Sequence, residues 1–106
     1  MSIPVLELLK TDPLYKVSNP IKVQKKAHKI YGKKFIVYKS NKEDKKYKII
    51  TPDGKSVHFG DATMEDYTKH LDLKRRRSYL ARATNIKGDW EKNIYSPNFL
   101  AIHLLW

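Results

Sequence analysis

The chain has 106 residues, a length that supports one domain with its own hydrophobic core. Its hydrophobic fraction of 41% and aromatic fraction of 11% are too high for a disordered chain. It contains no cysteine, which excludes disulfides and thiolate metal sites and fits a reducing, intracellular setting. No apolar stretch reaches the roughly 18 residues of a membrane span, and the first ten residues make a poor signal peptide.

The net charge of +11 is concentrated in one third of the chain. Residues 16–48 contain twelve lysines and only two acidic residues, whereas residues 49–106 contain nine basic and seven acidic residues. Such a concentration of positive charge attracts polyanions, of which nucleic acid is the commonest. Two alternatives remain at this point, namely lysines that only keep the domain in solution and an acidic protein surface as the partner.

The first third of the chain predicts an arm followed by a helix. Residues 1–18 form an N-terminal arm or a short helix. Asn19 and Pro20 favour a helix start, and Gly32 favours its end, so that residues 19–32 form one helix.

This predicted helix is amphipathic. At about 100° per residue, Val23, Ala27 and Ile30 share a stripe that faces the core. A basic ridge on a different side is formed by Lys22, Lys25, Lys26 and Lys29.

Residues 34–60 predict a three-stranded antiparallel meander. The segments 34–40, 45–50 and 55–59 are rich in β-branched and aromatic residues, and turn-forming residues separate them at 41–44 and 51–54. Together with the flanking helices, this meander gives an α+β fold in a single domain.

Residues 61–106 form the helical region. Thr63 and Asp66 resemble a capping box, and a longer helix is expected from about Asp72 to Thr84. After a loop at 85–93, a final helix begins at Ser96 and Pro97 and is apolar almost all round. Such a helix is either buried in its own core or docked into a partner through Phe99, Leu100, Leu104, Leu105 and Trp106.

The basic run within the helix at 72–84 divides into two roles. Arg76 shares the side of Leu73 and Leu80, so we expect a structural ion pair with Asp61, Asp66 or Asp72. Arg75 and Arg82 lie on another side with the Tyr79 ring between them, which favours phosphate contact and base stacking.

No catalytic, metal-binding or cofactor-binding pattern is present in the sequence. No two of His28, His58, His70 and His103 have the spacing of helical ligand pairs, so hydrogen-bonding or capping roles are favoured. The four glycines are isolated, so there is no phosphate-binding loop. The aromatic residues of the meander could stack on bases, but core positions are favoured for Phe35, Tyr38, Tyr47 and Phe59.

An ordered series of residues from His58 onward resembles a family of small uncharacterised proteins encoded by large DNA viruses of eukaryotes. The series consists of His58-Phe59-Gly60-Asp61, Asp66-Tyr67-Thr68-Lys69-His70 with Asp72, Arg75 and Arg76, Tyr79-Leu80 with Arg82, Trp90, Tyr95-Ser96-Pro97 with Phe99 and Leu100, and Leu104-Leu105-Trp106. The resemblance implies a viral origin, in a virion or an infected cell, and no established enzyme activity.

Composition and resemblance together predict a non-enzymatic basic structural protein, a minor capsid or virion-associated component that contacts larger capsid proteins or packaged genome. The alternative is a free, non-specific nucleic-acid-binding accessory protein. A small nuclease is the weakest reading, because no carboxylate or histidine cluster is evident. The residues expected to contact the polyanion are Lys22, Lys25, Lys26, Lys29, Lys33, Lys34, Lys42, Lys45, Lys46, Arg75 and Arg82.

Overall fold

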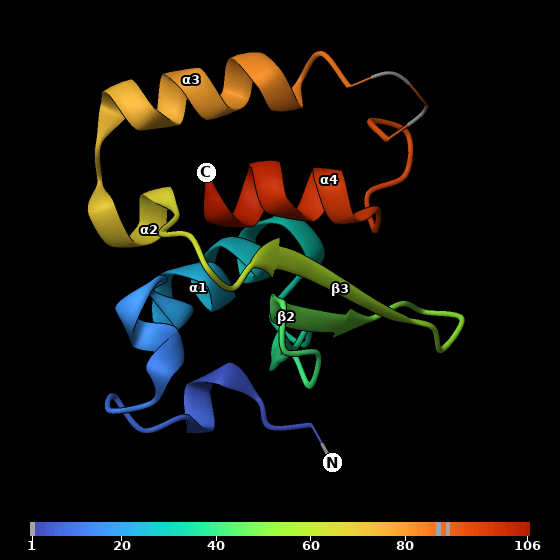
Figure 1. Ribbon diagram of the computed structural model, residues 1–106. Helices are drawn as coiled ribbons and strands as arrows, with labels where there is room; N and C mark the ends of the chain where they lie inside the picture. The colour runs from blue at the N-terminus through green and yellow to red at the C-terminus, as the bar shows by residue number, and fades with distance from the viewer. Residues whose placement is uncertain (1, 87, 89) are drawn as a thin grey trace.

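The computed structural model describes residues 2–86, 88 and 90–106 and shows the α+β fold that the sequence predicts. One antiparallel sheet has the order β1 (Tyr38–Lys39), β2 (Lys45–Ile50) and β3 (Ser56–Asp61) (Figure 1). In chain order, the helical elements are the 3-10 turns η1 (Val5–Glu7) and η2 (Pro13–Lys16), the helices α1 (Pro20–Tyr31), α2 (Tyr67–His70), α3 (Leu73–Ala83) and α4 (Pro97–Leu100), and the π-helical turn η3 (Ala101–Leu105).

The register of the sheet places its apolar side chains on one face. Tyr47 pairs with Phe59, and Ile49 pairs with Val57. The Tyr47 and Phe59 rings stack 5.6 Å apart, and both side chains are buried in the core rather than displayed for bases. The core positions predicted for Tyr47 and Phe59 are therefore confirmed.

The N-terminal arm forms two 3-10 turns and lines the outer side of the first strand. The Val5 N–H donates to the Val37 carbonyl over 2.9 Å, and the Lys39 N–H donates to the Ile3 carbonyl over 2.9 Å. The side chain of Val5 is fully buried. The arm therefore continues the sheet past β1.

Helix α1 is capped as its flanking residues predict, but its buried face differs. The Asn19 side chain accepts from the Lys22 N–H over 3.3 Å. Val23 and Ala27 are buried, whereas Ile30 is 42% exposed. The predicted core position of Ile30 was therefore wrong. The face of the helix that packs on the core includes Gln24 and not Ile30.

Gln24 of α1 binds the backbone of the segment that precedes the first strand. Its amide nitrogen donates to the Phe35 carbonyl over 2.7 Å, and its amide oxygen accepts from the Val37 N–H over 2.8 Å. The Val37 carbonyl accepts from the arm, so the groups that Gln24 binds lie on the edge of this segment that faces away from β2. Residues 34–37, predicted as part of the first strand, are not a strand in the structure.

The C-terminal helix is part of the core. Leu100 and Leu104 are fully buried and Leu105 is 1% exposed. Of the two alternatives that the sequence left open, burial in the protein's own core holds for these three leucines, and Phe99 and Trp106 of that set are partly exposed. The Ser96 side chain caps this helix at the expected place, accepting from the Phe99 N–H over 3.2 Å.

Helix α3 runs along one side of the molecule above α4 (Figure 1). It begins at the predicted cap, where Asp72 accepts from the backbone of the first turn. Only Ala83 of this helix is buried. The predicted loop at 85–93 contains no helix or strand among its described residues, and residues 87 and 89 lie outside them. None of the described helices has both the length and the apolar character that crossing a membrane requires.

Candidate polyanion-binding surface

Most of the lysines of residues 16–48 project into solvent. Seven of the nine lysines among the predicted contact residues are exposed, and no carboxylate of the described residues lies within 4 Å of their ammonium groups. We call these seven the lysine surface; they are Lys22, Lys25, Lys29, Lys33, Lys34, Lys42 and Lys45.

The larger part of the lysine surface follows α1. Lys22, Lys25 and Lys29 stand three and four residues apart, so they share one stripe of the helix. Lys33 and Lys34 continue the positive charge beyond the helix end. Lys26, the fourth predicted member of the ridge, is only partly exposed, and burial lowers its pKa while the Asp66 carboxylate opposes that shift.

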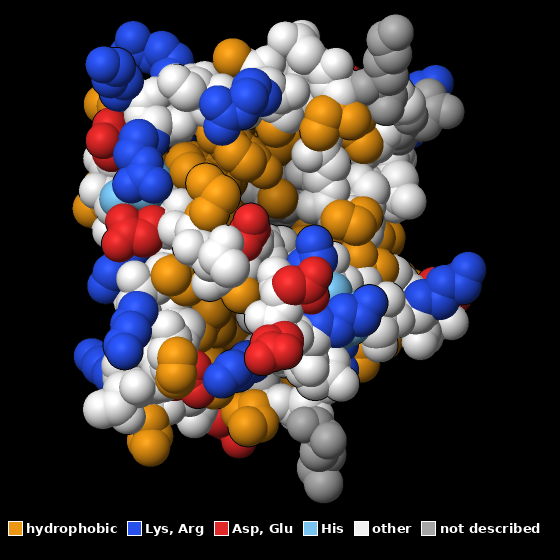
Figure 2. Space-filling view, in the orientation of Figure 1, with side chains coloured by type: hydrophobic (Ala, Val, Ile, Leu, Met, Phe, Trp, Pro, Cys, Tyr) orange, Lys and Arg blue, Asp and Glu red, His pale blue; other side chains and the backbone are white. Residues whose placement is uncertain are grey.

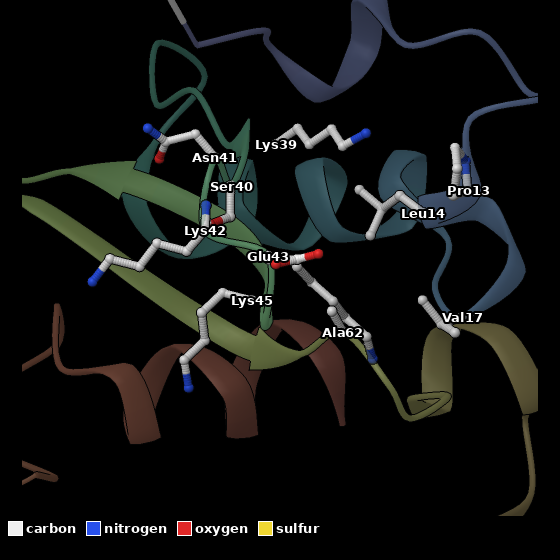
Figure 3. A pocket seen from close by; sticks show the side chains of 11 residues that line it. Pro13, Leu14, Val17, Lys39, Ser40, Asn41, Lys42, Glu43, Lys45 and Ala62 are labelled. Carbon is white, nitrogen blue, oxygen red and sulfur yellow. The ribbon is translucent and has the colours of Figure 1, made fainter.

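The smaller part lies on the hairpin between β1 and β2. A hollow of about 450 Å³ separates this hairpin from the η2 turn (Figure 3). The side chains of Lys42 and Lys45 extend away from the apolar wall formed by Leu14 and Val17, so their charges serve the outer surface rather than the hollow (Figure 3). Within the hollow, Lys39 is paired with Asp12 over 2.9 Å.

His58 lies beside this hairpin. Burial, followed by the nearby charges of Lys42 and Lys48, lowers the pKa of His58. Its Nδ1 atom is 2.7 Å from the Ser40 hydroxyl oxygen. An imidazole that stays neutral at pH 7 adds no repulsion to the lysines around it, and hydrogen bonding is the role that the sequence favoured for it.

Lys46 does not belong to the lysine surface, which corrects the sequence-based assignment. It is 3% exposed, and its ammonium group donates to the Asp66 carboxylate over 3.1 Å. Asp66 is fully buried. Asp66 is the N-cap of α2, so the α2 segment lies over Lys46 and encloses a side chain that would otherwise face solvent.

The Lys46–Asp66 pair is one end of a buried polar network. The second Asp66 oxygen accepts from the N–H and the hydroxyl of Thr68. The Thr68 hydroxyl oxygen lies 3.2 Å from that of Ser18, which in turn accepts from the Tyr47 hydroxyl over 2.5 Å. The network joins β2, α2 and the residue before the α1 cap. No sequence motif predicts it.

Burial shifts the titration of both ends of this network. It lowers the pKa of Lys46, against the attraction of Asp66, and it raises the pKa of Tyr47 well above the ordinary range. Desolvation disfavours the charged form of each group. Breaking the pair would leave one charge buried without a partner.

Arg76 has a different partner from the one predicted. Its Nε–H donates to the backbone oxygen of Trp106 over 2.7 Å, and its guanidinium lies 5.4 Å from the centre of the Tyr67 ring. None of the three candidate carboxylates pairs with it in the described part of the chain. Each is engaged locally instead: Asp66 with Lys46, Asp61 with Thr63 and Asp72 with the first turn of α3.

The proposed stacking role of Tyr79 is also corrected. Its ring stacks on the Trp106 ring with centroids 4.3 Å apart, which fastens α3 to the C-terminal helix. Arg75 and Arg82 are exposed as predicted, and Arg75 lies 3.6 Å from the Glu65 carboxylate. The predicted capping box fails as well, because Thr63 donates to Asp61 and Asp66 caps α2 itself.

The described residues contain no group of three or more histidine, aspartate or glutamate side chains arranged to hold a metal ion. His70 participates in backbone structure. Its Nδ1 accepts from the Asp72 N–H over 2.9 Å, and its buried Nε2 has no hydrogen-bond partner among these residues.

Residues 35–83 match the model of a family of unknown function, DUF5754. No curated protein and no solved structure shows a significant match to the chain. The matched segment spans the sheet, α2 and α3, and it includes Lys46 and Asp66. The whole α1 ridge and the whole C-terminal helix lie outside it.

Proposed function

We propose that this protein is a non-enzymatic basic protein that binds nucleic acid through the lysine surface, without sequence selectivity. The observation that carries the proposal is the exposure of seven lysines that have no carboxylate partner in the described structure. Because these ammonium groups form no ion pair that stabilises the fold, they are available to contact phosphates.

The chemistry of the surface favours backbone contact over base reading. Lysine ammonium groups are flexible point charges, whereas base recognition usually needs planar, directional donors such as arginine or amide side chains. The aromatic rings of the sheet are buried or engaged with other side chains. Affinity should therefore come from the release of counterions.

A virion is the setting that we propose for this binding, with the protein as a minor capsid or virion-associated component. This part of the proposal is supported by the resemblance of the residues from His58 to Trp106 to small proteins of large DNA viruses. A free accessory protein in infected cells is the competing setting. Stoichiometric recovery of the protein from salt-washed particles would support the virion, and its absence from purified particles would contradict it.

Fluorescence anisotropy with short labelled duplexes tests the binding itself. Two duplexes of unrelated sequence should bind with the same affinity. Replacing Lys22, Lys25 and Lys29 together by alanine should weaken binding at least about tenfold, because three phosphate contacts are lost. The matched control replaces Lys10, Lys55 and Lys92, which are exposed but lie outside the lysine surface.

Equal losses for the two triple variants would show that net charge alone drives binding and would contradict the assigned surface. A strong preference for one duplex would contradict the proposed mode. Absence of binding to either duplex at low salt would overturn the proposed function.

A further inference from the structure

Three aromatic side chains from two distant parts of the chain meet at the end of α1. Tyr31 is the last residue of this helix, Phe35 follows it, and Tyr95 lies just before α4. The Tyr31 ring centroid is 4.3 Å from that of Phe35 and 5.5 Å from that of Tyr95, and the other two centroids are 6.4 Å apart. The ring planes are inclined by 20° to 22°, so they face in nearly the same direction. We call these three residues the aromatic cluster.

Backbone interactions hold the aromatic cluster in place. The Phe35 N–H donates to the Gly32 carbonyl over 3.2 Å, and this turn brings the Phe35 ring against Tyr31. Gly32 has a φ of +104°, which a residue with a side chain rarely adopts. The Tyr31 hydroxyl donates to the Ile94 carbonyl and ties the C-terminal segment to α1. The rings are therefore positioned before any ligand binds, which reduces the entropic cost of binding.

The aromatic cluster is open to solvent. All three of its residues pack against the core but remain partly exposed. In this respect they differ from the stacked pair of the sheet, Tyr47 and Phe59, which are 0% and 1% exposed. The cluster can therefore be reached by a flat group from outside the protein.

Lysines of the lysine surface adjoin the aromatic cluster. Lys33 and Lys34 occupy the two central positions of the turn between Gly32 and Phe35, and both are exposed. Lys29 lies in the last turn of α1. None of these three ammonium groups has a carboxylate within 4 Å in the described structure.

The positive charge at the cluster is not balanced by acidic residues. Figure 2 shows a face of the molecule on which acidic side chains lie among the basic ones. Residues 28–36, in contrast, contain three lysines and no acidic residue. Residues 90–96, which carry the third ring, contain Glu91 and Lys92, whose charges cancel. The two segments together therefore have an excess of three positive charges.

Rings beside unpaired cations suit a nucleotide whose base is not in a duplex. The cations attract the phosphate, and the base stacks on a ring; every base has a π-face, so this contact tolerates any sequence. In a duplex, neighbouring base pairs cover the faces of the bases. A surface that acted through charge alone would favour the duplex, because its charge density is higher.

We propose that the aromatic cluster stacks on unpaired bases, so that the protein binds single-stranded nucleic acid more tightly than duplex. This inference rests on the proposed function, because the lysine surface supplies the phosphate contacts. It adds the class of nucleic acid that the protein prefers.

Fluorescence anisotropy at low salt with three labelled DNA probes of equal length tests the preference. The probes are a single strand of mixed sequence, the corresponding duplex, and a strand that carries stable abasic sites in place of its bases. The wild type should bind the single strand at least about fivefold more tightly than either of the other probes, because they offer the phosphates without accessible bases. This comparison requires no variant.

Two double variants assign the preference to the aromatic cluster. Phe35→Leu with Tyr95→Leu keeps apolar side chains but removes two rings, so the preference for the single strand should be lost while duplex binding is unchanged. Phe35→Tyr with Tyr95→Phe keeps both rings and should retain the preference. Tyr15→Leu, which removes a partly exposed ring outside the cluster, should retain it as well.

Equal binding of the wild type to the single strand and the abasic strand, or tighter binding to the duplex, would overturn the inference and leave the proposed function in place. A folded leucine double variant that keeps the preference would also overturn it. Absence of binding to all three probes would overturn the inference and the proposed function together.

Discussion

Two adjacent lysines of β2 show how differently one residue type is used in this protein. Lys45 is exposed, whereas Lys46 is enclosed and paired with Asp66. Alternation along the strand predicts that they point to opposite faces, and it predicts the burial of Tyr47 correctly. It does not predict what covers the polar face, because that depends on where the distant α2 segment packs. The partner of Arg76, the backbone oxygen of Trp106, could not be predicted for the same reason, because it depends on where a distant segment packs.

Truncating these two lysines should therefore have very different effects on stability. Lys46→Ala leaves the Asp66 carboxylate buried without its partner and should lower the free energy of unfolding by about 3–5 kcal/mol. Lys45→Ala should change it by no more than about 0.5 kcal/mol. Urea denaturation followed by circular dichroism measures both. Similar values for the two variants would show that the buried pair does not stabilise the fold.

His70 makes stability depend on pH near neutrality. Its pKa is lowered from 6.5, first by burial and then by the charge of Arg75. The unfolded chain therefore takes up a proton at a higher pH than the folded chain. The stabilisation is complete above pH 6.5 and is lost as the pH falls below that value and through the lowered pKa.

Replacing His70 by glutamine should flatten the decline in unfolding free energy between pH 7 and pH 5. His58→Gln serves for comparison, because burial lowers the pKa of that residue too. The lowered carboxyl pKa values of Asp12 and Asp61 act at more acidic pH and do not overlap this window. An unchanged pH profile in both variants would contradict this assignment.

At the scale of elements, the helix boundaries were more predictable than the strands. Asn19, Asp72 and Ser96 cap helices where the sequence placed them, because a cap is a local interaction between a side chain and the next turn. The first strand was predicted too long, because residues 34–37 do not pair with β2 and are instead tied to α1 by Gln24 on their other edge. Local chemistry can be inferred from the sequence, but the bonds of a distant side chain cannot.

The contact between β3 and the C-terminal helix depends on Gly60. Its backbone has a φ of +84°, and an added Cβ would lie 2.9 Å from a methyl carbon of Leu105. Gly60→Ala should therefore lower the free energy of unfolding. Overpacking against Leu105 costs about 1–3 kcal/mol, and backbone strain adds to this loss. Gly54→Ala is the matched control, with a φ of +87° and no atom within 4 Å of the added Cβ. Thermal unfolding should show a clearly larger loss for Gly60→Ala, and equal losses would exclude the close approach as its cause.

At the scale of the whole molecule, the protein separates the charges that hold it together from those that it displays. The buried network uses Lys46, and the pair with Asp12 uses Lys39, while the lysine surface has no such role. The sequence predicted the excess of charge and its location in the chain, because both follow from counting. It could not predict which lysines are available, since availability depends on the packing of elements far apart in sequence.

The central claim is that the lysine surface binds nucleic acid by neutralising phosphates, and the salt dependence of duplex binding tests it most directly. If about five to seven lysines contact phosphates, the slope of log K against log salt should be about −4.5 to −6. The variant lacking Lys22, Lys25 and Lys29 should have a slope smaller in magnitude by about 3, whereas Lys46→Met, which removes a buried charge, should leave the slope unchanged if the variant folds. A wild-type slope near zero, or a triple variant with the slope of the wild type, would contradict the account.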